Sequence, residues 1–251
     1  MPSAEPSPER YEHYVIKALG SDDSLSTYEY ETIASGLAGV WARENTREAL
    51  FEAMQKKETY ATTGTRITVR FFGGWDYDKN DVFRPDAVSI GYREGVPMGG
   101  DLSKPPAGEK APVFMVGAMK DPWSGNLDRV QIVKGWVDER GERQERIYDV
   151  AVSDGREINA DGHCKTPIGD TVDTAKASYL NSIGDAELRV VWTDPDFEPT
   201  LPAVYYARVL EIPTPTWQAH DTNFFGIEMP KEIPLKHQER AYTSPIWYTP
   251  W

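Results

Sequence analysis

The chain has 251 residues, 39% of them hydrophobic, and a net charge of −13 at pH 7, so it can form one large domain or two small ones around a packed core. The negative charge repels phosphate backbones and anionic membrane surfaces, which argues against nucleic-acid and membrane partners; solubility alone also accounts for it. One cysteine excludes an intrachain disulfide, no apolar run approaches eighteen residues, and the first residues lack a signal-peptide pattern. The sequence therefore predicts a soluble protein and leaves its compartment open.

The N-terminal part has the pattern of a tail followed by one strand and one helix. Residues 1–10 contain three Pro and two Ser, and we expect no regular structure there. The short apolar run GLAGVWA at 36–42 predicts a buried strand. Asn45 is a good N-cap residue, with Glu48 three positions later as in a capping box, so the following helix should run to about Glu58.

This strand and helix, over residues 36–64, read as the last unit of an α/β barrel that is otherwise missing. We therefore expect residues 1–64 to be an N-terminal tail and the closing unit of a truncated barrel. The chain would then be the C-terminal part of a larger enzyme. A second consequence is that the apolar helix face with Leu50, Phe51 and Met54 would favour association with the missing barrel or with another copy of the chain.

From Arg66 onward the pattern is that of strands separated by Pro and Gly turns. Eight Trp and thirteen Tyr favour sheets over a helical bundle. The fold class we predict is α+β, mostly β, with the barrel remnant followed by a β-sandwich-like domain at 65–251. The predicted strands are 66–72, 87–92, 113–118, 130–137, 146–152, 188–192, 204–212 and 244–248.

No complete catalytic motif is present. The four histidines are scattered, without the spacing of a metal site; they are His13, His163, His220 and His237. The segment Asp76–Asn80 begins like a calcium loop, but Asp81 replaces the turning Gly, so an acidic turn is the better reading. Asp194-Pro195-Asp196 is first a turn and only second a catalytic carboxylate pair. Cys164 is expected to be a buried structural thiol.

One candidate site remains at the end of the first predicted strand. Arg43, Glu44 and Asn45 follow it directly, at the edge where a barrel places its substrate groups. Arg43 could bind an anionic oxygen with two hydrogen bonds, and Glu44 could move a proton. The alternative is that Asn45 is only a helix cap and that Arg43 pairs with a neighbouring glutamate.

Long blocks of the sequence resemble the domain of unknown function 3604 family, a branch of the PHP (polymerase and histidinol phosphatase) superfamily. They include VWARENTREALFEAMQKKETYATTGTRITVRFFGGW, DRVQIVKGWVD, VWTDPDFEP and YYARVLEIPTPTW, in that order. The resemblance implies a metal-dependent hydrolase of phosphate-like or related esters, whose barrel binds two or three divalent ions (Zn, Mn or Fe) through His and Asp/Glu side chains. The H-x-H and Asp-x-His segments typical of the family are absent, so no metal ligand and no cofactor is expected within this chain.

Two functions follow from these observations, beside a third reading in which the chain is a fragment without an independent role, from a truncated gene or a misplaced start codon. In the first, the chain is the C-terminal portion of such a hydrolase, inactive in isolation and completed by the missing barrel or by a homo-oligomer. In the second, it is a non-catalytic β-sandwich module that binds a carbohydrate or a protein. The rings of the module would be Trp75, Trp123, Trp136 and Trp217, although packing in the core is the simpler role for them.

Overall fold

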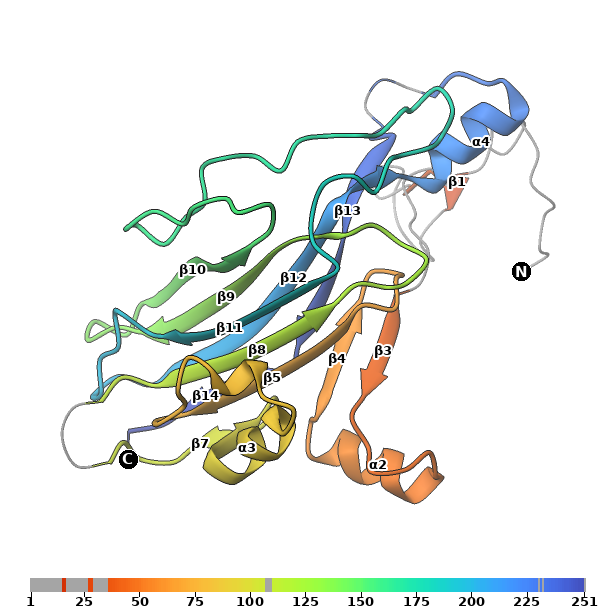
Figure 1. The fold of residues 1–251 in the computed structure, drawn as a ribbon. Helices are drawn as coiled ribbons and strands as arrows, with labels where there is room; N and C mark the ends of the chain where they lie inside the picture. The colour runs from red at the N-terminus through yellow and green to blue at the C-terminus, as the bar shows by residue number, and fades with distance from the viewer. Residues whose placement is uncertain are drawn as a thin grey trace. The chain divides into compact units, whose positions relative to one another are not determined.

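The computed structural model describes residues 15–16, 27–28, 36–106, 110–229, 231 and 233–250 (Figure 1). The chain divides into two compact units. The first comprises residues 1–35, 170–182 and 213–238, and the second comprises 36–169, 183–212 and 239–251. The strand and helix predicted to close a barrel thus lie in the same unit as the β-rich remainder. The predicted domain boundary after Gly64 separates a barrel remnant from the β domain, and it stays a prediction.

The first unit has little regular structure among its described residues. A short antiparallel pair is formed by β1 (Val15–Ile16) and β2 (Thr27–Tyr28). Helix α4 (Trp217–Phe225) was not predicted, and it ends at Gly226, whose left-handed φ of 67° favours glycine. The side chain of Asn223 on this helix donates to the carbonyl oxygen of Ala175 at 3.1 Å.

The second unit contains two sheets. The larger has eight strands, six of them in the order β10-β9-β12-β13-β4-β3; β14 pairs with β12, and β7 pairs with β14. The smaller has four strands in the order β11-β8-β5-β6. The strands of the larger sheet are β3 (Leu37–Val40), β4 (Thr59–Thr62), β7 (Asp101–Leu102), β9 (Leu127–Val137), β10 (Arg143–Val152), β12 (Ala203–Pro215), β13 (Lys236–Thr243) and β14 (Ile246–Tyr248). Those of the smaller sheet are β5 (Thr68–Gly74), β6 (Gly95–Pro97), β8 (Val113–Met119) and β11 (Glu187–Thr193).

The two sheets share one apolar core, as a sandwich requires. Alternate residues of the smaller sheet, among them Phe71 and Phe114, are fully buried against Tyr205 and Val209 of the larger one. The rings of Phe114 and Tyr205 lie 4.5 Å apart between their centroids. The described strand pairs of both sheets are antiparallel, with the exception of β7 and β14, which are parallel. The predicted mostly-β α+β class is therefore confirmed.

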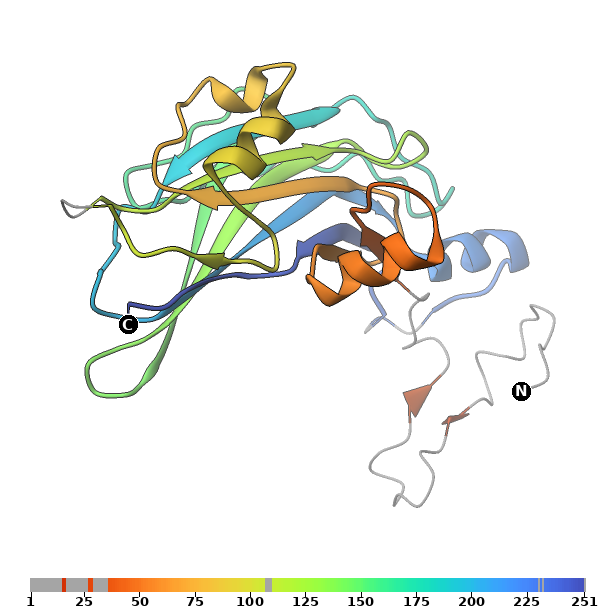
Figure 2. The same cartoon turned by 90° about the horizontal axis from the view of Figure 1, so that it is seen from below.

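A third layer covers part of the other face of the smaller sheet. Figure 2 shows helix α3 (Ala87–Glu94) and the 3₁₀ helix η3 (Asp81–Phe83) on the side of this sheet away from β9 and β12. Ile90 packs there with Phe72 and Met115 in a second apolar cluster. A Cβ at Gly91 would lie 2.6 Å from the ring of Phe72, so only glycine lets the helix approach the sheet this closely.

Most predicted strands are confirmed, two local predictions are wrong, and one strand was not predicted. Residues 87–92 form α3 instead of a strand, because Ile90 and Gly91 supply a helical contact face three and four positions after Ala87. Strand β13 was not predicted, since its sequence KHQERAYT has too few apolar residues to give the period of a strand. The cap of the first long helix, α2 (Arg47–Gln55), is Thr46 and not Asn45: its hydroxyl accepts from the N–H of Ala49 at 3.3 Å.

The segment predicted to close a barrel lies at the edge of the larger sheet. Strand β3 pairs with β4 in antiparallel register, Leu37 opposite Thr62, and it is the last strand in the sheet order. Helix α2 connects the two strands and leaves Phe51 and Met54 exposed at 61% and 52%. The barrel itself and the association of this apolar face with a partner stay predictions.

Candidate functional site

The three residues predicted to bind substrate lie in the exposed turn between β3 and α2. Arg43, Glu44 and Asn45 are all solvent-exposed. Glu44 accepts a hydrogen bond from the hydroxyl of Thr46 at 3.2 Å, so it supports the helix cap. Their proposed contact with a substrate stays a prediction. Their neighbour Trp41, in the same unit, lines a cavity.

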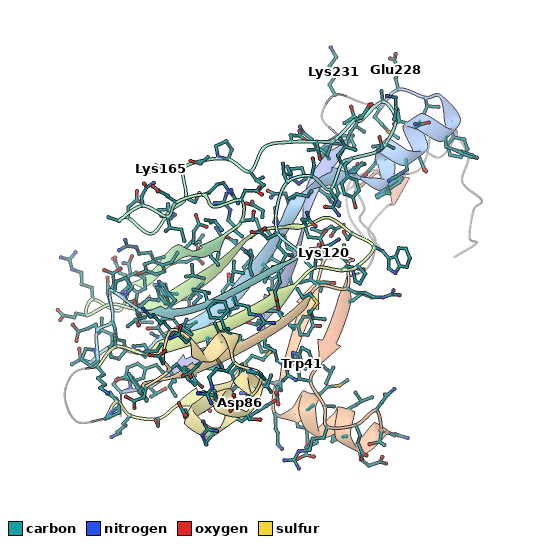
Figure 3. The ribbon with its side chains drawn as sticks, viewed as in Figure 1. Trp41, Asp86, Lys120, Lys165, Glu228 and Lys231 are labelled. Atoms are coloured by element: carbon teal, nitrogen blue, oxygen red, sulfur yellow. The ribbon has the colours of Figure 1, made fainter. Side chains whose placement is uncertain are left out.

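This cavity has a volume of about 370 Å³ and lies on the face of the smaller sheet that points away from the shared core. That volume is in the range of small-molecule sites. Its floor is made by the three strands β5, β8 and β11, and its walls are the segment 82–88 and Trp41. Figure 3 labels Trp41, which precedes α2, and Asp86, which lies within the segment 82–88 and directly before α3. The floor residues are Thr68, Arg70, Phe72, Met115, Gly117, Met119, Glu187 and Arg189.

Two arginines face each other across a glycine in the centre of the floor. In the strand register, Arg70 of β5 is opposite Gly117 of β8, and Gly117 is opposite Arg189 of β11. A Cβ built on Gly117 would meet nothing within 4 Å. The row Arg70–Gly117–Arg189 therefore has a side chain at each end and open space in the middle. We call this row the arginine row.

Arg70 is held by contacts on several sides. Its guanidinium carbon lies 3.4 Å from the ring centroid of Trp41, in cation–π contact. The indole N–H of Trp41 donates to the carbonyl oxygen of Val69 at 2.8 Å, which fixes the ring. One Arg70 nitrogen lies 3.1 Å from the hydroxyl of Tyr92 and 3.5 Å from the carboxylate of Glu58. The guanidinium is thus fixed in place before any ligand binds.

Tyr92 and Glu58 are themselves hydrogen-bonded: the Tyr92 hydroxyl donates to the Glu58 carboxylate. Burial and this hydrogen bond raise the pKa of the Tyr92 hydroxyl, so it stays protonated near neutral pH. Its one O–H is donated to Glu58 and its oxygen accepts from Arg70, so the role of Tyr92 is to position Arg70. The arrangement can bind and orient a negatively charged group.

Arg189 and Arg84 are held by exposed partners. In Arg189, Nε and one terminal nitrogen contact the Glu187 carboxylate, at 2.6 and 2.5 Å. The other terminal nitrogen donates to the Val82 carbonyl oxygen at 3.3 Å. Arg84 pairs with Asp86 at 3.0 Å. In both pairs the side chains are at least one-third exposed. Exposed ion pairs stabilise by only about 0–1 kcal/mol, so an arriving anion can replace either carboxylate at little loss.

A separate cluster of charges lies inside the sandwich. Lys134 of β9 contacts Asp194 at 2.6 Å, with the two side chains 4% and 0% exposed. The hydroxyl of Tyr205 donates to the same carboxylate at 2.8 Å, and that of Tyr148 donates to Asp196 at 2.6 Å. Burial, followed by the nearby carboxylates, strongly raises the pKa of both tyrosines. The adjoining cavity is only about 20 Å³, so this cluster joins Asp194-Pro195-Asp196 to the sheet and leaves no room for a substrate.

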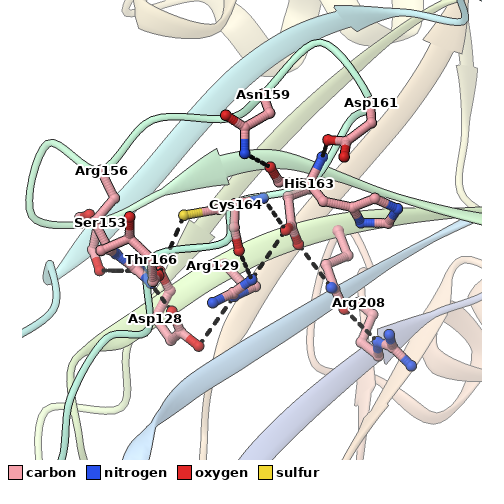
Figure 4. Close-up of polar contacts among 12 residues, drawn as sticks. Asp128, Arg129, Ser153, Arg156, Asn159, Asp161, His163, Cys164, Thr166 and Arg208 are labelled. Atoms are coloured by element: carbon pink, nitrogen blue, oxygen red, sulfur yellow. Dashed lines mark hydrogen bonds and ion pairs between the residues drawn. The ribbon is translucent and has the colours of Figure 1, made fainter.

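A second polar network, drawn in Figure 4, holds the segment after β10 on the larger sheet. Arg129 donates to Asp149 at 3.0 Å, and Asp149 also accepts from the backbone N–H of Cys164 at 2.8 Å. Arg156, almost fully buried, pairs with Asp128 at 2.6 Å. Cys164 is 8% exposed and its thiol contacts only the carbonyl oxygen of Thr166 within this network. The predicted burial of this thiol is confirmed.

The described residues do not assemble a metal site. No group of three or more His, Cys, Asp or Glu side chains among them is arranged to hold an ion. His163, His220 and His237 are exposed, and His13 lies outside the described residues. The Asp76–Asn80 segment is an acidic turn, as predicted: the carboxylate of Asp78 accepts from the backbone and side-chain nitrogens of Asn80.

The tryptophans proposed for sugar binding are in different environments. Trp75 is 7% exposed and packs edge-on against Phe197 and Tyr248, so its faces belong to the core. Trp136 is half-buried against the same core. Trp123 is 88% exposed. The predicted role in core packing is confirmed for Trp75. To stack on a sugar, the Trp75 ring would have to leave the core.

Glu211, on β12, is a buried carboxyl group with an unusual pKa. It is 0% exposed and accepts from the hydroxyl of Ser124. Burial raises its pKa from 4.5 to about 7, although the hydrogen bond from Ser124 acts in the opposite direction. The folded chain therefore keeps a proton on Glu211 at pH values where the unfolded chain has released it.

This difference predicts a pH dependence of stability. Because the folded-state pKa is the higher one, the contribution of protonated Glu211 is complete below about pH 4.5 and is lost as the pH rises through about 7. Relative to the Glu211→Gln variant, the free energy of unfolding of the parent should fall by about 2–3 kcal/mol between these two pH values. Urea unfolding of both proteins from pH 4.5 to 7.5 checks this; parallel profiles would contradict it.

The arginine row was missed in the sequence because register creates it. Arg70, Gly117 and Arg189 are far apart in the chain, and each stands in an ordinary strand pattern. Gly117 was the one available signal, since a glycine inside a strand weakens it and often marks a place where a ligand or another backbone approaches.

Comparison with known proteins gives one match. A sequence model of the family described as "Protein of unknown function (DUF3604)" matches residues 3–250. No curated protein and no solved structure matches the chain. Across the described part of the chain, every helix is too short or too polar to reach from one side of a membrane to the other.

Proposed function

The chain belongs to the family described as "Protein of unknown function (DUF3604)", and from this premise we propose that it is the C-terminal portion of a PHP-type metal-dependent hydrolase of phosphate-like or related esters. In this proposal the cavity with the arginine row binds part of the substrate, and residues outside this chain hold the divalent ions. The PHP assignment rests on the resemblance of the long sequence blocks described above.

The observation that carries the proposal is the position of Trp41. This residue follows directly on β3, the strand that the resemblance assigns to the closing barrel unit, and it forms a wall of the cavity. Its ring also lies on the guanidinium of Arg70 in the floor. Trp41 therefore belongs both to the segment that we expect to contact the barrel and to the wall of the cavity in the β domain. This is the arrangement expected if a substrate lies between the barrel and the β domain.

The described residues of this chain do not fit the metal centre of such a hydrolase. Since no metal-binding group is formed among the described residues, we derive no catalytic step for this chain. A bound divalent ion would supply an activated water to the reaction; the arginine row would bind and orient the anionic group.

We predict that the purified 251-residue chain does not hydrolyse esters. The expected result is no release of 2-naphthol from 2-naphthyl phosphate above the buffer rate, with Zn²⁺, Mn²⁺ or Fe²⁺ added, because no ligand set holds the ion near the cavity. Fluorescence of the released naphthol is the measurement, and a chain boiled in denaturant is the control. Metal-dependent turnover that a chelator abolishes would contradict the prediction.

The test of the assignment itself is the DNA immediately upstream of the Met1 codon in the source genome. An open frame in phase with Met1 that encodes H-x-H and later Asp-x-His agrees with the proposal. A stop codon or unrelated sequence there would overturn it. The hydrolysis assay would then be repeated on the longer protein.

A second candidate is the non-catalytic binding module. The observation that favours it is that floor and walls of the cavity all come from the second unit of this chain, so the cavity needs no other segment to exist. In this case the chain alone would bind its ligand, and the upstream DNA would encode no barrel.

A further inference from the structure

The geometry points to a specific ligand class for the cavity: we propose that it binds an apolar organic anion, with the anionic head over Gly117 in the arginine row and the apolar body over the exposed Met119, two positions further along β8. This inference deepens the proposed function, and it depends on that function only for the statement that the ligand is a substrate. The binding itself is argued from the cavity alone. The head can be a phosphate, sulfate or carboxylate.

The first step of the argument is the space above Gly117. Its two register partners both carry guanidinium groups, and a Cβ on Gly117 meets nothing within 4 Å. Neighbouring strands are about 4.8 Å apart, so the Cα atoms of Arg70 and Arg189 are separated by about 10 Å, or two strand spacings. An anionic group placed over the glycine would lie between the two arginine positions, about one strand spacing from each.

The second step is the chemistry of the two cations. A guanidinium presents parallel N–H donors that match the oxygens of carboxylate, sulfate or phosphate. Trp41 and Tyr92 hold Arg70, and the Val82 carbonyl holds Arg189. Because both groups are already positioned, little side-chain freedom is lost when a ligand binds.

The third step is the apolar part of the cavity. Met119 and Val88 line it and are 52% and 40% exposed. Met115 and Phe72 lie deeper in the floor, at 2% each. Methionine adapts to varied apolar shapes, and a ligand over Met119 and Val88 would remove their exposed surface from water. Inorganic anions cannot use this surface, which is why an organic body is required.

The fourth step is the competitor already present. The carboxylate of Glu187 bonds Arg189 and is itself 41% exposed. A ligand head must share or displace this carboxylate, so Glu187 lowers affinity for anions. This gives the proposal an unusual signature, because removal of an acidic side chain should tighten binding while removal of its arginine partner should weaken it.

The experiment is isothermal titration of the purified 251-residue chain with four probes: 2-naphthyl phosphate, 2-naphthoate, neutral 2-naphthalenemethanol and inorganic phosphate. Both naphthyl anions should bind at least tenfold more tightly than the neutral alcohol, since one charge-assisted interaction corresponds to about a factor of ten. Inorganic phosphate should bind at least tenfold more weakly than 2-naphthyl phosphate.

Three variants locate the site. Arg189→Gln should weaken the two naphthyl anions about tenfold and leave the neutral alcohol unchanged, whereas Glu187→Gln should tighten the anions severalfold. Gly117→Val should abolish binding of all naphthyl probes by filling the space over the row. Gly117→Ala, whose added methyl group meets no atom within 4 Å, should retain the fold and weaken the anions, and the thermal midpoint of each variant shows that it is folded.

The proposal is overturned if no naphthyl probe binds at 5 mM or if the alcohol equals the anions. It is also overturned if inorganic phosphate equals 2-naphthyl phosphate, or if folded Arg189→Gln and Gly117→Ala bind like the parent. These outcomes are independent of the proposed hydrolase. If the naphthyl anions bind and a stop codon stands upstream of Met1, this inference holds and the proposed function is overturned. If the anions do not bind and the upstream frame encodes H-x-H and Asp-x-His, this inference is overturned and the proposed function holds.

Discussion

Replacing Lys134 by alanine is expected to lower the free energy of unfolding by about 3–5 kcal/mol. The Lys134 ammonium group contacts the Asp194 carboxylate and the Asp196 carbonyl oxygen, each at 2.6 Å. The Asp194 side chain is 0% exposed. Without the ammonium group a carboxylate would remain buried without its cation, which is far more unfavourable than the loss of an exposed pair. Urea unfolding followed by tryptophan fluorescence gives the change.

The matched control is Lys56→Ala on α2. Lys56 also contacts a carboxylate, that of Glu52, at 2.5 Å, but both side chains are more than 60% exposed. Its replacement should change the free energy of unfolding by about 0.5 kcal/mol or less. Equal effects of the two replacements, or a loss below about 1 kcal/mol for Lys134→Ala, would show that the internal cluster does not stabilise the sandwich as we infer.

The second large effect is expected for Gly99→Ala. Gly99 has a φ of 86°, which alanine rarely adopts. An added Cβ would also lie 2.3 Å from the backbone oxygen of Lys57, at the end of the α2 segment. Since a backbone atom cannot move aside alone, we expect a loss of about 3 kcal/mol or more in the free energy of unfolding.

Gly117→Ala is the control for this replacement. Its φ is not in the left-handed region and its Cβ has open space, so the free energy of unfolding should be unchanged or higher by up to about 1 kcal/mol. The same exchange at two glycines of one unit thus has opposite expected results. A folded Gly99→Ala protein with parental stability would contradict the backbone conformation described for residues 99 and 57.

The sequence predicted the sandwich well where burial is regular. Strands such as β8 and β12 alternate or run apolar between turn residues, and a period of two follows directly from strand geometry. The sequence failed where tertiary contacts decide. Residues 87–92 resemble a strand in composition, but Gly91 lets them pack as a helix on Phe72. Strand β13 is held by its neighbours β12 and β4, and its own residues are mostly polar.

The candidate site was predictable only in part. The end of the first predicted strand pointed to Arg43, Glu44 and Asn45, which begin two positions after Trp41, the side chain that lines the cavity. Trp41 looked like one more apolar residue of the strand, and its contact with Arg70 depends on how β3 and β5 are arranged. Arg70, Gly117 and Arg189 become neighbours only through the register of three strands, which no single segment of sequence determines.

The most direct test of the central claim, that the arginine row is the ligand site of this chain, is a ¹H–¹⁵N NMR titration with 2-naphthyl phosphate. The resonances to follow are the amide of Gly117 and the side-chain Nε–H groups of Arg70 and Arg189. We predict that these three shift first and saturate together, while the indole N–H of the exposed Trp123 does not move. Shifts confined to Trp123 or to other residues outside the cavity, with these three unchanged, would contradict the account.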